Sequence, residues 1–307
     1  MVQGPGGLLA VHHILGEEPK AAVVLIHGFA QNHASFECRD RSFLAYLASH
    51  GLDVFAPDLR GVGQSNGAPL ARSFRDYVDE DLPAVVRYVH ETGGRGPLFL
   101  VGHSLGGAVA CAFAGRHNVS GVVTISGVYA FGSASRLIRA IARFSRCLPN
   151  RQARIHTDTL GHILAFGQPL IDVCPDLLFP LRAWARGSMA GGALRQAICD
   201  SFAPVSSLMG RELLSFALGE VPRDHAGVPY FQAFERADCP LLVIASESDS
   251  LVPPSDARQA FERSTSRDRT YILLDRTRGL GHLDILIGDL APELVWRPVV
   301  EWIKARL

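Results

Sequence analysis

The stretch "PLFLVGHSLGGAVACAFAG", residues 97–115, places one hydroxyl, Ser104, between two glycines where one apolar run gives way to another. The first run predicts a buried strand and the second predicts a helix. The spacing Gly102-x-Ser104-x-Gly106 is typical of a nucleophile held on a sharp strand-to-helix turn. Such a turn strains the backbone and brings the chain close to itself, and a glycine two residues to either side leaves the room it needs.

The strand signature recurs along the chain and predicts a mostly parallel sheet, because each run is rich in Val, Ile and Leu without polar alternation. The six runs cover residues 21–28, 52–58, 97–103, 119–127, 240–249 and 270–275. Helix-like segments lie at 42–51, 73–90, 255–264 and 291–307, with Ser255 expected to cap the third and Pro298 to kink the last. This alternation indicates the α/β fold class, with helices on both faces of the sheet.

The alternation stops between about residues 129 and 237, where helix formers and aromatic residues dominate and no clear strand is found. We therefore expect a core domain made of residues 1–128 and 238–307, and an inserted helical cap, 129–237. The cap is expected to lie over the C-terminal edge of the sheet, where open α/β sheets keep their sites. Its aromatic residues are expected to form a small core of the cap and to line an acyl pocket: Phe166, Phe179, Trp184, Phe202, Phe216, Tyr230 and Phe231.

The composition of the chain indicates which partners and which cellular compartment to expect. Lys+Arg and Asp+Glu both total 30, so charge gives no reason to expect a nucleic-acid partner. No run reaches the ~18 apolar residues of a membrane helix, and no signal-peptide pattern is found. The six cysteines show no Cys-x-x-Cys spacing, which favours reduced thiols in a cytoplasmic protein.

Neither a metal nor another cofactor is expected. The pairs His12-His13 and His27/His33 lack metal-ligand spacing. The glycines of "GPGG" at 4–7 follow no strand, so they do not form a dinucleotide loop.

A serine hydroxyl is a weak nucleophile and needs a general base that is itself oriented by an acid. On such a sheet these partners follow the serine in the order Asp/Glu, His, at the ends of later strands. The segment "IASESDSLVPP" supplies Asp249, and "RGLGHLDILIG" supplies His282 in a glycine-flanked loop after the last strand. Glu247 and Asp284 lie two residues from these positions and remain alternatives for the acid.

An oxyanion that forms at the serine needs backbone N–H donors. One is expected from Leu105, at the N-terminus of the helix after Ser104, and the other from Phe29, in the turn "HGFA" at 27–30. His103 is expected to pack at the strand end, pointing away from Ser104. The loop "DLRGVGQS" at 58–65 is expected either to wall the site or to be purely structural.

Together, "HGFAQNHASF", "DLRGVGQS", "GHSLGG", "SESDSLVPP" and "GHLDILIG" resemble the α/β-hydrolase family, in the family's order, across the whole chain apart from the cap. The resemblance implies a hydrolase with Ser104 as nucleophile, His282 as base, Asp249 as acid, and Phe29 and Leu105 as oxyanion donors. The serine separates the chain from branches that use aspartate or cysteine. The tail "GHLDILIGDLAPELVWRPVVEWI" is similar to acid lipases and synthase-like members, which implies lipophilic ester substrates.

Three functions follow as hypotheses. The first is hydrolysis of a carboxylic ester with a hydrophobic acyl or alcohol part through an acyl-enzyme. The second keeps the acyl-enzyme but makes the protein a thioesterase or an acyltransferase or cyclase, acting on CoA- or carrier-linked acyl groups. The third is non-catalytic ligand binding on the same fold.

The segment "RLIRAIARFSRCL" predicts an amphipathic cap helix. Its two faces are Arg136, Arg139, Arg143 and Arg146 on one side and Leu137, Ile141, Phe144 and Leu148 on the other. One interpretation packs the apolar face against the protein and leaves the basic face in water. The other makes the helix a docking surface for an anionic partner, such as a lipid headgroup, a carrier protein or coenzyme A.

Overall fold

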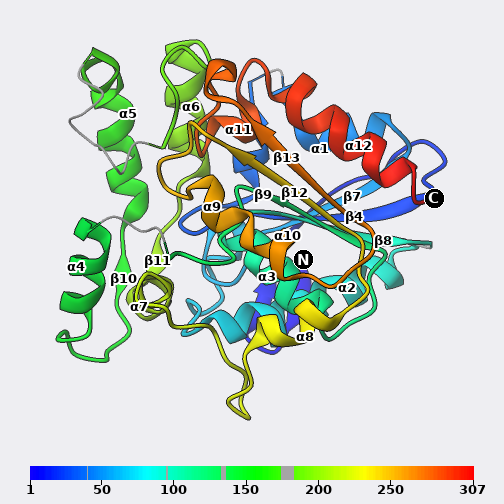
Figure 1. The fold of residues 1–307 in the computed structure, drawn as a ribbon, viewed down its shortest axis with the longest axis horizontal. Helices are drawn as coiled ribbons and strands as arrows, with labels where there is room; N and C mark the ends of the chain where they lie inside the picture. Colours follow the sequence, from blue (N-terminus) through cyan, green and yellow to red (C-terminus); the bar gives the residue numbers. More distant parts are fainter. Residues whose placement is uncertain (40, 95, 133–135, 174–182) are drawn as a thin grey trace.

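The computed structural model describes residues 1–39, 41–94, 96–132, 136–173 and 183–307. Figure 1 shows a twisted sheet covered by helices, with a group of helices beyond one end. The sheet has seven strands in the order β13-β12-β9-β8-β4-β7-β3, all parallel except the edge strand β3, which is antiparallel to β7. Their bounds are β3 Val11–Ile14, β4 Ala21–Ile26, β7 Leu52–Pro57, β8 Leu98–His103, β9 Gly121–Ile125, β12 Leu241–Ser246 and β13 Arg269–Leu274.

All six predicted strands are confirmed, and five of them are buried along their whole length. The sequence did not predict β3, whose four residues are half-exposed and include two histidines. It also did not predict two short hairpins, β1–β2 and β5–β6. These pair Val2–Gly4 with Gly7–Leu9 and Glu37–Cys38 with Arg41–Ser42.

Helices cover both faces of the sheet, as the alternation predicts. One buried cluster joins the sheet to α2 (Leu82–Glu91), α3 (Leu105–Ala114) and α8 (Tyr230–Arg236). A second cluster joins the other face to α1 (Phe43–Ser49), α11 (Asp284–Ile287) and α12 (Arg297–Lys304). Ser42 caps α1 by accepting a hydrogen bond from the Ala45 N–H.

Three predicted helices differ in detail. The segment 255–264 forms two short helices, α9 (Pro254–Ala257) and α10 (Gln259–Arg263), and Pro253 rather than Ser255 precedes the first. The segment 73–90 begins with a π-helical turn, η3 (Asp76–Asp81), before α2. A similar turn, η6 (Pro292–Trp296), precedes α12, where Pro298 is the second residue. The irregularity expected at Pro298 therefore takes the form of a π turn in the preceding residues, since a proline cannot donate a helical hydrogen bond.

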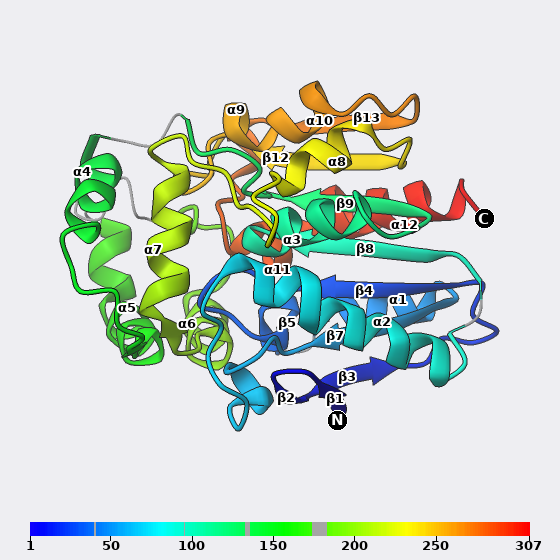
Figure 2. The same cartoon turned by 90° about the horizontal axis from the view of Figure 1, so that it is seen from below.

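Between β9 and β12 the chain forms several helices, and all but the last lie beyond the ends of the parallel strands (Figure 2). The last, α8, packs beside α3 on one face of the sheet. We refer to residues 129–237 as the cap segment. Its elements are α4 Arg136–Ser145, β10 Arg154–Ile155, α5 Thr157–Val173, α6 Gly191–Ser201, β11 Val205–Ser206, α7 Ser207–Phe216 and α8. The expectation of no strand is wrong for β10 and β11, which pair antiparallel over two residues each. A run of two residues is too short to show a periodicity in the sequence.

The cap aromatics do not form a core of their own. Phe216, Tyr230 and Phe231 lie in the buried cluster of α3, and Trp184 and Phe202 pack in or against the cluster on the other face. Phe166 is 85% exposed, and Phe179 lies outside the described residues. No helix among the described residues is both long enough and apolar enough to cross a bilayer.

Candidate active site

Ser104 lies between β8 and α3 with φ +51° and ψ −119°, a strained conformation for a residue with a side chain. The neighbouring glycines explain how the turn closes. A Cβ at Gly102 would overlap the Gly106 carbonyl oxygen, and a Cβ at Gly106 would overlap that of Ile26 in β4. The sequence pattern therefore produces a turn pressed against its own backbone and against the next strand, with the hydroxyl at its tip.

Two distant loops bring a histidine and a carboxylate to this hydroxyl. His282, in the loop between β13 and α11, has Nε2 3.0 Å from Ser104 Oγ. Its Nδ1 lies 2.7 Å from Oδ2 of Asp249, which follows β12. The other carboxylate oxygen of Asp249 accepts hydrogen bonds of 2.9 Å from the Leu251 and Val252 N–H groups. All three side chains are buried, so the hydrogen-bonded chain is shielded from bulk water.

The alternative acids occupy other positions. Glu247 is exposed and accepts a hydrogen bond from the Arg276 N–H at 3.1 Å. Asp284 is fully buried and accepts from the Gly281 N–H at 2.9 Å and from the cap residue Ala185 at 3.1 Å. Burial raises the pKa of Asp284 to about 6, although these N–H donors favour its ionised form. Asp284 therefore fixes the loop that carries His282 and joins that loop to the cap.

His103 has a partner that sequence reasoning missed. It is fully buried, and its Nε2–H donates to the carbonyl oxygen of His282 at 2.9 Å. Its Nδ1 lies 3.0 Å from Oε1 of Gln31, which also accepts from the Gly28 N–H at 3.1 Å. Burial and the nearby His282 lower the pKa of His103 well below its usual value. His103 thus links the turn after β4 to the loop of His282.

The two expected oxyanion donors belong to different segments of the chain. Leu105 is the first residue of α3, and Phe29 lies in the loop after β4, next to Ala30 with φ +60°. The cap holds this loop from outside. The Asn32 N–H donates to Ser201 and the Ala203 N–H donates to Ala30, both at 3.0 Å.

A cavity of about 580 Å³ contains Ser104 and His282. Its walls are mostly apolar and come from the loop after β4, from the loops after β9 and β12, and from α4 and α7 of the cap. Among the aromatics expected to line a pocket, Phe202 does so, together with Phe29, Phe131 and Phe144. None of the residues 58–65, all of them described, contributes to this lining. The loop 58–65 therefore has the structural role.

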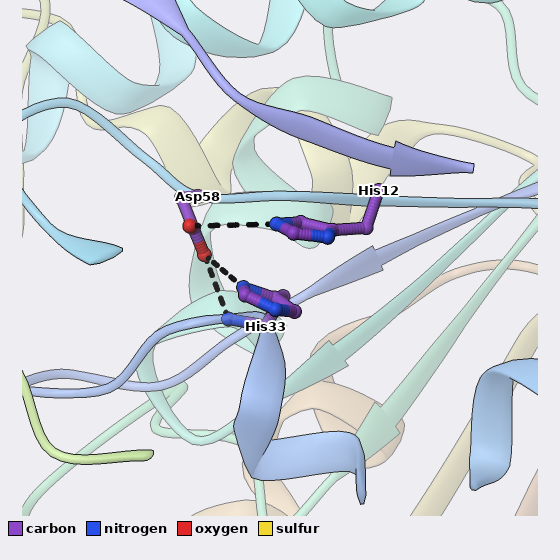
Figure 3. Close-up of side chains that lie close together, drawn as sticks. All are labelled: His12, His33 and Asp58. Carbon is purple, nitrogen blue, oxygen red and sulfur yellow. Dashed lines mark hydrogen bonds and ion pairs between the residues drawn. The ribbon is translucent and has the colours of Figure 1, made fainter. Parts of the chain in front are cut away.

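Figure 3 shows the contacts that Asp58, the first residue of this loop, makes with His12 and His33. Buried Asp58 accepts hydrogen bonds from the N–H and from Nδ1 of His33, at 2.8 and 2.9 Å. The His12 ring stacks on His33 at 3.3 Å between centroids, and its Nε2 lies 3.7 Å from Asp58. One nitrogen of each ring and a carboxylate oxygen of Asp58 lie within 4.8 Å of one another, a grouping that could hold a metal ion. The cluster ties β3 to the loops after β4 and β7, and the absence of a metal stays a prediction.

The cap helix α4 packs through a different face from the one that the packed interpretation predicts. Its buried residues are Ile138, Ala142 and Ser145, and the first two pack on Ala217 after α7. The four apolar residues expected to be packed are instead exposed: Leu137, Ile141, Phe144 and Leu148. The packed interpretation is therefore wrong, because a different and narrower stripe, Ile138 and Ala142, makes the contact with the end of α7.

A sequence model of the alpha/beta hydrolase fold matches residues 21–283. The chain belongs to the α/β-hydrolase family. The match begins at β4 and ends just after His282, so it includes Ser104, Asp249 and the cap segment.

Several relatives within the family carry lipase names. The monoacylglycerol lipase of Mycolicibacterium smegmatis is 25% identical over 99% of this chain and 96% of its own length. The mouse monoglyceride lipase is 27% identical over 94% of this chain and 84% of its own. A Schizosaccharomyces pombe relative with the monoglyceride lipase name is 25% identical over 83% of this chain, but this chain spans only 60% of that protein.

The fold is shared with solved structures. The monoacylglycerol lipase of Paleococcus ferrophilus superposes with a TM-score of 0.67 at 22% identity, covering 98% of this chain and all of that one. An esterase from Exiguobacterium antarcticum superposes with a TM-score of 0.64 at 16% identity, covering 99% and 98%. At these identities the likeness supports the fold alone.

Proposed function

We propose that this α/β-hydrolase cleaves carboxylic esters of hydrophobic acyl groups, with monoacylglycerols as the substrate class. The observation that carries the proposal is the hydrogen-bonded chain Ser104–His282–Asp249 opening into a cavity with apolar walls. An apolar pocket with a few convergent polar groups suits an acyl chain with one reactive ester. The lipase names of the relatives support the same class.

In the proposed mechanism, Ser104 Oγ attacks the ester carbonyl while His282 Nε2 takes its proton. Asp249 accepts the hydrogen bond from Nδ1–H and stabilises the imidazolium that forms. The N–H groups of Phe29 and Leu105 donate to the oxyanion. His282 then protonates the leaving alcohol, and a water activated by the same ring releases the acid from the acyl-enzyme.

We assign the cap segment, residues 129–237, as the part that shapes the acyl site. Support comes from the number of its elements that reach the cavity, including α4, β10, β11 and α7. The remaining walls belong to loops of the core, residues 1–128 and 238–307. Substrate choice is then a property of the insertion, whereas bond cleavage is a property of the core.

A fluorophosphonate probe tests the nucleophile. We expect one covalent adduct by intact mass and loss of both the adduct and ester hydrolysis in Ser104→Ala, by at least about 10³-fold. Ser126→Ala is the matched control, because Ser126 is buried at the end of the neighbouring strand with φ +47°. Labelling that survives in Ser104→Ala contradicts the assignment, and a protein that binds acyl ligands without labelling is a non-catalytic binder.

The second hypothesis is tested in the same assay. Monoacylglycerols, p-nitrophenyl esters of increasing chain length, acyl-CoA and a carrier-linked thioester are compared at equal concentration. We expect the highest kcat/KM on oxygen esters of long acyl chains, since the cavity walls are apolar. A preference for thioesters contradicts the carboxylic ester as the substrate class, and transfer to an added acceptor in place of water contradicts hydrolysis as the reaction.

A further inference from the structure

Exposed apolar side chains gather on one part of the cap. Of the fifteen large hydrophobic side chains that are exposed in the described chain, eight lie between residues 137 and 166. Leu137, Ile141, Phe144 and Leu148 follow one another at helical spacing in and just after α4. Leu160, Ile163 and Phe166 do so on α5. We call these seven residues the cap patch.

The cap patch lies on the outermost helices of the molecule. Figures 1 and 2 both show α4 and α5 at the edge of the cap, farther from the sheet than α7. The exposed fractions are large for apolar side chains, at 67% for Phe144, 63% for Ile163 and 85% for Phe166. Exposed apolar side chains gathered in this number on neighbouring elements of the chain are typical of an interaction site.

The charge of the same stretch is unlike that of the rest of the chain. Residues 136–166 contain six arginines, at positions 136, 139, 143, 146, 151 and 154, against a single carboxylate, Asp158. The whole chain, by contrast, has 30 basic and 30 acidic residues. Exposed helices that combine an apolar stripe with arginines are typical of segments that lie in the surface of an anionic bilayer.

The cavity of the candidate active site reaches the cap patch. Ile141, Phe144 and Leu148 belong to the patch and also line the cavity that contains Ser104. A side chain that is both exposed and part of the lining marks the mouth of a cavity. An acyl chain that left a bilayer in contact with the patch would meet apolar surface from the lipid to the reactive serine.

We propose that the cap patch and its arginines dock on an anionic lipid bilayer, and that the acyl ester enters through the mouth formed by α4. The second half of this proposal rests on the proposed function, and the first half does not. A second copy of this chain is a poor occupant, because two such arginine-rich faces repel each other. A free coenzyme A tail would not need so many exposed apolar side chains.

The test measures sedimentation of the full-length protein with vesicles of phosphatidylcholine alone and with phosphatidylglycerol added to 30 mol%. We expect binding to the anionic vesicles, at least 10-fold weaker binding to the neutral ones, and release at 0.5 M NaCl. The triple variant Leu137→Gln, Ile163→Gln, Phe166→Gln changes patch residues outside the cavity lining. It is expected to lose at least 10-fold in binding to anionic vesicles.

The matched control is the triple variant Leu8→Gln, Leu15→Gln, Leu273→Gln, which changes exposed apolar residues of the core. It is expected to bind like the wild type, and circular dichroism checks that both variants are folded. No wild-type binding to either vesicle, equal binding to both, or an equal loss in both triple variants overturns the proposal. The proposal is also overturned if the wild type does not bind vesicles but forms a dimer, and the patch variant is monomeric. That result assigns the surface to a second copy of the chain.

Activity separates this proposal from the proposed function. The patch variant should hydrolyse a soluble short-chain p-nitrophenyl ester like the wild type, and lose at least 10-fold on monoacylglycerol embedded in anionic vesicles. Vesicle binding without hydrolysis of either ester refutes the proposed function and leaves the docking intact. Hydrolysis of both esters without vesicle binding refutes the docking and leaves the proposed function intact.

Discussion

At the scale of single residues, the structure distinguishes two carboxylates that lie two positions apart. Asp249 turns inward from the end of β12 and contacts both His282 and the N–H groups of its own loop. Glu247 accepts from the Arg276 N–H and lies in solvent. Alternation along a strand would place two residues two positions apart on the same face. The difference therefore comes from the turn after β12, which Asp249 closes by accepting from the Leu251 and Val252 N–H groups.

We therefore predict opposite outcomes for two conservative variants. Asp249→Asn keeps the shape but removes the charge that orients His282 and stabilises its protonated form, so kcat should fall about 10⁴-fold. Glu247→Gln should stay within about twofold of the wild type. Steady-state kinetics on a soluble p-nitrophenyl ester measure both. Comparable losses in the two variants would show that the acid has been assigned to the wrong residue.

The order of motifs made it possible to predict from sequence that Ser104, Asp249 and His282 belong together. The role of His103 could not be found in that way. Its partners, Gln31 and the His282 carbonyl, are 72 and 179 residues away. Tertiary packing decides which loop contacts a given face at the end of a strand. The alternation of side chains along the strand does not predict this contact.

At the scale of elements, the loop that carries His282 is fixed from both sides. The Ser246 hydroxyl at the end of β12 donates to the Leu280 carbonyl, and the Leu283 N–H donates to Ala183 of the cap at 2.7 Å. Asp284 adds the contacts to Gly281 and Ala185. His282 is thus positioned by the core and the cap together.

Asp284 makes this junction pH-dependent. Its folded pKa of about 6 lies above the unfolded value of 3.8, so the folded protein holds a proton that the unfolded chain releases between these values. The stability contributed is present below about pH 4 and is lost as the pH rises through 6. Relative to Asp284→Asn, which does not titrate, the wild type should lose up to about 3 kcal/mol of unfolding free energy across this window.

Urea unfolding at several pH values between 4.5 and 7.5 measures this slope. The control Asp289→Asn, whose side chain is 60% exposed five residues further on, should keep the wild-type slope. A wild-type curve parallel to that of Asp284→Asn would mean that Asp284 is ionised throughout and that burial does not govern its proton.

The long elements were predictable because their patterns are strong. The six predicted strands are rich in apolar residues on both faces. They can therefore be recognised without knowing how each strand is aligned with its neighbours. The pairing of β10 with β11 was not predictable, since two residues a strand carry no period. The orientation of α4 was also missed, because Ile138 and Ala142 make a narrower stripe than the exposed apolar residues beside it.

At the scale of the whole molecule, the cap and the core share their buried clusters. Met209 and Phe216 of α7 lie in the cluster of α3 and the sheet. Trp184 and Leu194 of the cap lie in the cluster of α1 and α12 on the other face. Among its described residues, the cap segment has one small cluster to itself, formed by Ile138, Ala142 and Ala217. The insertion visible in the sequence is therefore an insertion in the chain rather than an independently packed unit.

This sharing predicts that the inner cap unfolds together with the core. Amide hydrogen exchange, followed by mass spectrometry in rising urea, should give peptides from α6 and α7 the same midpoint as peptides from β8 and β9. Peptides from α4 and α5 should exchange at lower urea, because much of their apolar surface has no protein cover. If α6 and α7 lose protection while the sheet stays protected, the cap is a separate folding unit. In that case the shared clusters do not couple it to the core.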